Sequence, residues 1–101
     1  MDVIFTILAD KEYWHEVNYY SDIGNELRKL FVGSLDKTIS EIGANPFLCH
    51  NRGNGIFSVR LKGFPISVFY KIKDNYILVI SICHERRNPV VWKVIKKRPT
   101  R

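Results

Sequence analysis

Several features that would assign a protein to a defined class are missing from this sequence. It has only two cysteines, Cys49 and Cys83, which are too few for a disulfide framework. No apolar run approaches the roughly 18 residues of a membrane span. The N-terminal segment carries an acid, Asp2, where a secretory signal carries a cation. We therefore expect a protein of the reducing cytoplasm.

Patterns for metal and phosphate binding are also missing. The Cys-His dipeptides at 49–50 and 83–84 could supply four zinc ligands, but neighbours on a strand point to opposite faces. The glycines at 53–55 precede a predicted strand, whereas a phosphate loop lies between a strand and a helix. The second half has only two acids, Asp74 and Glu85, so no catalytic carboxylate pair is evident. We predict no metal and no cofactor.

Positive charge is concentrated in the second half of the chain. The net charge of the 101 residues is +6. Residues 1–50 carry four cations and eight acids, whereas residues 51–101 carry twelve cations and two acids. A basic half of this kind indicates an anionic partner, although basic surfaces also serve solubility alone.

Apolar periodicity predicts one domain of class α+β. The expected order is a strand, a helical hairpin and a three-stranded antiparallel meander, with both helices on one sheet face. The predicted elements are strand 3–8, helix 11–20 with Asp10 as its N-cap, helix 25–42 and strands 56–62, 66–72 and 76–84. Residues 44–54 are expected to form a loop, 90–97 a short element of uncertain type, and 98–101 a mobile basic tail of the domain 1–101.

The two faces of the predicted sheet differ in character. One face is expected to bury the helical stripe that includes Leu30, Phe31, Leu35 and Ile39. The other face is expected to be open and basic, carrying Ser58, Arg60, Lys62, Ser67 and Lys71.

The segment 83–92 is the densest in functional residue types. Arg86 and Arg87 are suited to phosphate or carboxylate, and His84 could act as an acid or base near neutral pH. Alternatively, one of the arginines forms a salt bridge with Glu12 or Glu16.

Four motifs occur in this order along the chain: Asn45-Pro46, Val59-Arg60-Leu61, Phe64-Pro65 followed by Val68-Phe69-Tyr70, and His84-x-Arg86-Arg87-Asn88-Pro89-x-x-Trp92. Together they resemble the RelE/ParE superfamily of bacterial toxins, most closely the ParE-like, plasmid-stabilisation branch. The resemblance covers nearly the whole chain. It implies a small cytoplasmic toxin of a type II toxin–antitoxin module, neutralised by a cognate antitoxin.

The resemblance leaves two mechanisms open. ParE-type toxins inhibit growth by binding, with DNA gyrase as the expected target. RelE-type toxins are ribosome-dependent, metal-independent mRNA endonucleases, and that alternative would use Arg60, His84 and Arg87 as catalytic residues. Ser58 and Ser67 stand where RelE-type toxins carry cations. We favour gyrase binding; a non-toxic basic binding domain is the third alternative.

Binding of target or antitoxin is expected to use six residues: Arg60, Lys62, Lys71, Arg86, Arg87 and Trp92. An acidic, partly apolar antitoxin segment would neutralise these cations and cover apolar grooves beside the helices. Its affinity is then expected to fall as salt rises.

Overall fold

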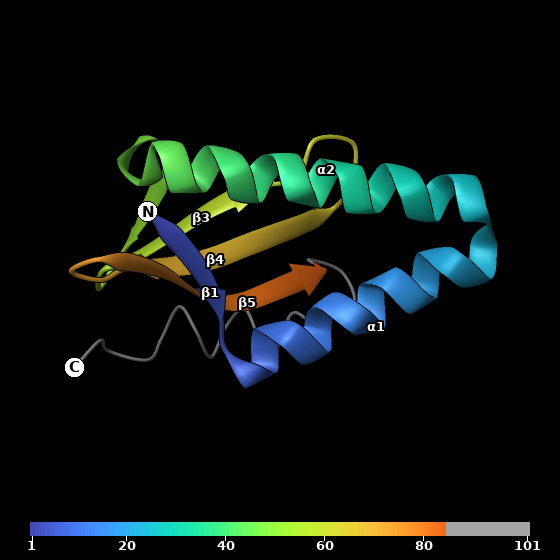
Figure 1. Ribbon diagram of the computed structural model, residues 1–101, viewed down its shortest axis with the longest axis horizontal. Coiled ribbons are helices and arrows are strands. Elements are labelled where there is room, and N and C mark those ends of the chain that lie inside the picture. The colour runs from blue at the N-terminus through green and yellow to red at the C-terminus, as the bar shows by residue number, and fades with distance from the viewer. Residues whose placement is uncertain (85–101) are drawn as a thin grey trace.

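A short strand leads into two long helices and then into four antiparallel strands (Figure 1). The computed structural model describes residues 1–84 of the chain. The sheet order is β1-β5-β4-β3-β2, with β1 parallel to β5 and the other neighbours antiparallel. The elements are β1 (Asp2–Phe5), α1 (Ile7–Ile23), α2 (Asn25–Ala44), the 3₁₀ turn η1 (Pro46–Leu48), β2 (His50–Gly53), β3 (Ile56–Arg60), β4 (Ile66–Ile72) and β5 (Tyr76–His84).

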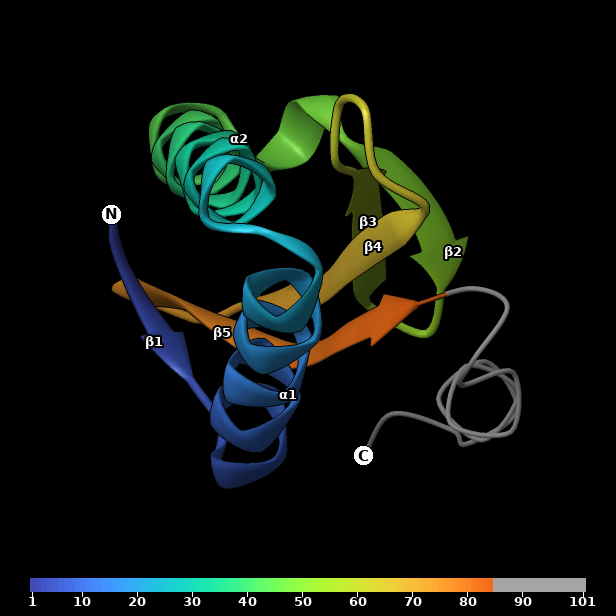
Figure 2. The same cartoon turned by 90° about the vertical axis from the view of Figure 1, so that its right-hand side faces the viewer.

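The predicted α+β class, with a helical hairpin packed on the sheet, is confirmed. Figure 2 views both helices nearly end-on, beside the twisted sheet. One core cluster joins buried residues of both helices to buried residues of β4 and β5. The sequence predicted a meander of three strands, whereas the structure has four, because β2 pairs with β3 at the edge of the sheet.

The first helix begins earlier than predicted. Its N-cap is Thr6, whose hydroxyl accepts a hydrogen bond from the backbone N–H of Ala9 at 3.1 Å. Asp10 therefore lies in the first turn, where its charge favours the helix dipole. The first strand accordingly ends at Phe5 and not at residue 8.

The second helix buries part of its predicted stripe, and Ile39 is half-buried. Phe31 is fully buried, and its ring centroid lies 4.9 Å from that of Tyr20 and 5.5 Å from that of Phe64. Leu35 is also buried. The prediction was wrong for Leu30, which is 64% exposed. Leu30 lies at the margin of the stripe, so it shares the apolar pattern without reaching the sheet.

The segment 44–54, predicted as a loop, contains η1 and β2. β2 pairs with β3 through a hairpin whose Asn54 and Gly55 both have positive φ, at 56° and 74°. Two consecutive positive φ values characterise the type I′ turn, which matches the twist of paired strands. An Asn-Gly dipeptide therefore closes a strand pair that apolar alternation could not indicate.

Alternation along β3 and β4 follows the predicted pattern, but the second sheet face is not open. Ile56, Phe69 and Cys83 form a separate buried cluster on this face. Ser58 and Ser67 are only 3% and 2% exposed. The expected open basic surface is therefore wrong at its centre, and the exposed cations of this face stand at its margin.

Glu12 of α1 completes the hydrogen bonding of β5 beyond the end of β1. Its carboxylate oxygen Oε1 accepts from the Ser81 hydroxyl at 2.8 Å and from the Ile82 backbone N–H at 3.0 Å. β1 pairs with β5 only as far as Val79. The side chain of Glu12 thus replaces the acceptor that a longer β1 would have supplied.

Candidate binding surface

The predicted strand cations lie at two ends of the second sheet face. Arg60 ends β3, is exposed, and donates through Nε to the carbonyl oxygen of Phe64 at 3.5 Å. Its register partner on β4 is Ser67. Lys71, near the other end of β4, is half-buried. Arg60 and Lys71 share a face by alternation. They are not neighbours on it, because Lys71 lies four positions along β4 from Ser67, the residue that pairs with Arg60.

Lys62 does not join this face. β3 ends at Arg60, and Lys62 lies in the turn between β3 and β4. The Ser34 hydroxyl of α2 donates to the Lys62 carbonyl oxygen at 3.0 Å and ties this turn to the helix. The grouping of Lys62 with the strand cations is therefore corrected: it belongs to the surface along α2.

His84 is the last residue of β5 and is 8% exposed. It pairs in register with Ile66, a member of the helix-facing core. Arg60 pairs with Ser67, the next residue of the same strand, so Arg60 and His84 lie on opposite faces of the sheet. The structure therefore does not bring these two proposed catalytic residues together. Arg86, Arg87 and Trp92, with the expected element 90–97 and tail 98–101, lie outside the described residues.

Arg52 of β2 is a surface residue that the sequence reasoning missed. Its Nε donates to the Ser58 hydroxyl at 2.7 Å, and its guanidinium carbon lies 6.0 Å from the centroid of the Phe69 ring. Arg52 therefore crosses the second sheet face from the edge strand. The signal that could have placed it there is the Asn54-Gly55 dipeptide, which predicts a hairpin and hence a strand through Arg52.

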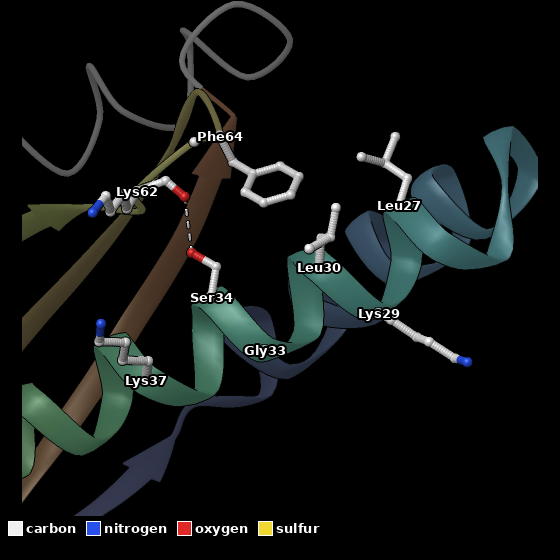
Figure 3. Close-up of a pocket in the computed structure, with 9 residues that line it drawn as sticks. Leu27, Lys29, Leu30, Gly33, Ser34, Lys37, Lys62 and Phe64 are labelled. Atoms are coloured by element: carbon white, nitrogen blue, oxygen red, sulfur yellow. Dashed lines mark hydrogen bonds between the residues drawn. The ribbon is translucent and has the colours of Figure 1, made fainter.

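A groove runs between α2 and the β3–β4 turn (Figure 3). Its volume is about 540 Å³. Leu27, Leu30 and Phe64 form its apolar floor, and their side chains converge in Figure 3. The remaining lining residues are Lys29, Gly33, Ser34, Lys37, Lys62 and Gly63, so the lining contains three lysines and no acid. The groove therefore combines apolar surface with positive charge.

Residues 1–84 offer exposed positive charge and exposed apolar surface for recognition. No group of three His, Cys, Asp or Glu side chains in this range is placed to hold a metal ion. Within the same range, no helix is both long enough and apolar enough to cross a membrane. The clearest perturbed acid is Glu12, whose pKa is raised because burial disfavours the charged form more than its two hydrogen bonds favour it.

Comparisons with known proteins give one family match and one similar fold. A model of the ParE toxin of the type II toxin–antitoxin system parDE matches residues 3–89. A solved structure described as the chromosomal ParDE toxin–antitoxin system from P. aeruginosa has a similar fold, with a TM-score of 0.69 at 20% sequence identity. The similarity covers 81% of this chain and 92% of that chain. No curated protein matches the sequence significantly.

Proposed function

The chain belongs to the family of ParE toxins of type II toxin–antitoxin systems, and on that premise we propose that it inhibits bacterial growth by binding DNA gyrase. The observation that carries this proposal is the family match over residues 3–89. We further propose that it acts in the cytoplasm and that a cognate antitoxin neutralises it. The solved relative's description as a ParDE system supports an antitoxin partner.

The arrangement of the described residues favours binding over RNA cleavage. A nuclease of the RelE type would need cationic and acid–base groups around one phosphate. Arg60 and His84 lie on opposite sheet faces, and Ser58 and Ser67 are buried polar residues without charge. These observations give less support to cleavage than to an inhibitor that works by contact.

Inducible expression tests the proposed target. Expression of the chain alone is expected to stop growth and to induce DNA-break signalling, because a poisoned gyrase leaves broken DNA. Co-expression of the neighbouring open reading frame should restore growth. Cleavage of translated mRNA without DNA breaks would instead indicate the ribosome-dependent endonuclease, and normal growth would indicate a non-toxic binding domain.

Arg60 is a proposed target contact, and its replacement gives a sharper prediction. Arg60→Ala is expected to weaken gyrase inhibition about ten-fold, equivalent to about 1.4 kcal/mol, because an exposed guanidinium is lost at a charged interface. Supercoiling assays with purified gyrase measure the effect. Lys73→Ala is the matched control, since Lys73 is an exposed cation in the β4–β5 hairpin and outside the proposed contact. Equal losses in both variants would contradict a specific role for Arg60.

A further inference from the structure

The basic residues of β2, β3 and β4 all lie on the second sheet face. They are His50, Arg52, Arg60 and Lys71, and these three strands contain no aspartate or glutamate. His50 lies on this face because its register partner on β3 is Ser58. Arg60 follows Ser58 by two residues, and Arg52 donates to the Ser58 hydroxyl. His50, Arg52 and Arg60 are thus grouped around one serine, and we call these three residues the β2–β3 basic cluster.

A β-bulge in β2 fixes the position of Arg52. The register shifts between Asn51 and Gly53, so Arg52 is the extra residue of the bulge. The Asn51 Oδ1 atom accepts from the Gly53 N–H at 2.8 Å, and Gly53 has the left-handed φ of 89° that favours glycine. The Arg52 side chain is held between the Ser58 hydroxyl at 2.7 Å and the Phe69 ring at 6.0 Å. A guanidinium held in this way loses little freedom when it binds an anion.

We propose that the β2–β3 basic cluster binds a backbone phosphate of the DNA that gyrase holds, so that the toxin recognises the gyrase–DNA complex and not gyrase alone. This inference rests on the proposed function, because it takes gyrase as the target. His50, Arg52 and Arg60 are all exposed. Guanidinium groups form paired, charge-assisted hydrogen bonds with phosphate oxygens, and the imidazole of His50 adds a ring N–H donor.

The composition of the cluster favours a phosphodiester over a carboxylate of a protein partner. Two guanidinium groups and an imidazole match the several oxygens of a phosphate, whereas a single guanidinium satisfies a carboxylate. Because β2, β3 and β4 carry no acid, their charge is of one sign, which suits a polyanion. DNA also lacks the 2′-hydroxyl that could attack the phosphate, so the contact leaves the backbone intact. This agrees with an inhibitor that works by contact.

Binding to gyrase with and without DNA tests the proposal. The fluorescently labelled full-length chain is titrated with purified gyrase, alone and bound to a DNA duplex, over a range of salt concentrations. Arg52→Gln removes the charge but keeps an amide that can donate to Ser58. Lys73→Gln is the matched control, because it removes the same charge from an exposed position of the β4–β5 hairpin, outside the cluster. Wild type and His50→Ala are also incubated with single-stranded RNA.

Wild type is expected to bind the gyrase–DNA complex at least about ten-fold more tightly than gyrase alone. Arg52→Gln should bind the complex about 10- to 100-fold more weakly and gyrase alone unchanged, since one charge-assisted contact is lost. Its log affinity for the complex should fall less steeply with log salt, by about 0.9, the slope that one phosphate contact contributes. Lys73→Gln should behave as wild type in both titrations, and the RNA should stay intact.

The outcomes separate the cluster from the proposed function. Equal wild-type binding to gyrase with and without DNA, or an unchanged salt slope in Arg52→Gln, would overturn the phosphate contact and leave gyrase as the target. Equal weakening of Arg52→Gln on gyrase alone and on the complex would overturn the choice of DNA in favour of a protein carboxylate. RNA cleavage that is lost in His50→Ala would make the cluster a nuclease site instead. If wild type binds neither form of gyrase, the proposed function fails and the phosphate contact fails with it.

Discussion

Replacement of Phe31 by alanine is expected to lower the free energy of unfolding by about 3 to 5 kcal/mol, the usual cost of removing a fully buried phenylalanine. Phe31 lies between α1 and the β3–β4 turn, with its ring against those of Tyr20 and Phe64. Neither ring can collapse far into the space left behind, because Tyr20 is held on its helix and Phe64 on a turn tied to α2. The cavity therefore adds to the lost transfer free energy.

The neighbouring residue of the same helix provides the control. Leu30→Ala removes a large apolar side chain that is 64% exposed, so a change within about 0.5 kcal/mol is expected. Urea unfolding followed by circular dichroism measures both variants, with the midpoint falling at unchanged m-value for Phe31→Ala. Since domains are stable by only about 5 to 15 kcal/mol, Phe31→Ala should also fall in cellular abundance. Equal destabilisation by the two replacements would contradict the packing described here.

The contrast between Leu30 and Phe31 shows how far apolar periodicity could predict the fold. The pattern located α2 closely and identified the buried Phe31 and Leu35. It could not tell which apolar residues at the margin of the stripe reach the sheet, because that depends on how the helix is rotated against its neighbours. Leu30, left outside the core by that rotation, became part of the groove floor.

The surface was less predictable because its parts meet only through tertiary structure. β2 has the sequence His-Asn-Arg-Gly and all of its residues are exposed, so it carries no alternation of apolar residues. Only the Asn54-Gly55 dipeptide marked it. Lys29 and Lys37 line the groove only because the β3–β4 turn packs against α2, a contact between segments far apart in sequence. The burial of Ser58 on β3 and Ser67 on β4 likewise could not be predicted, because alternation assigns small polar residues to the solvent-facing side of a strand.

The position of Glu12 depends on contacts that no local pattern contains. Its partners Ser81 and Ile82 are 69 and 70 residues away in sequence. The contact exists because β1 ends at Phe5, which leaves the last residues of β5 without a neighbouring strand on that side. An acidic residue early in a helix would ordinarily be assigned to solvent. The sheet edge gives this one a structural role.

Glu12→Ala is therefore expected to destabilise the fold by about 1.5 to 3 kcal/mol, because the part-buried Ile82 N–H and Ser81 hydroxyl lose their acceptor. Glu12→Gln is the matched control, since an amide oxygen can accept both hydrogen bonds without carrying charge. Urea unfolding at neutral pH should find the glutamine variant much closer to wild type. A loss of the same size in both variants would show that the charge, and not the acceptor, stabilises this edge.

Comparing Glu12→Gln with wild type also predicts the sign of a pH dependence of the unfolding free energy. Burial raises the folded-state pKa of Glu12 above the ordinary 4.5, with a smaller contribution in the same direction from Glu16 and an opposing one from His15. The folded state then binds the proton more tightly than the unfolded chain, so this group contributes less stability as pH rises from about 4.5 through its folded pKa. Glu12→Gln removes that dependence. Its unfolding free energy relative to wild type should therefore rise between pH 4 and pH 7, and a flat difference over that range would mean that the Glu12 carboxyl has an ordinary pKa in the fold.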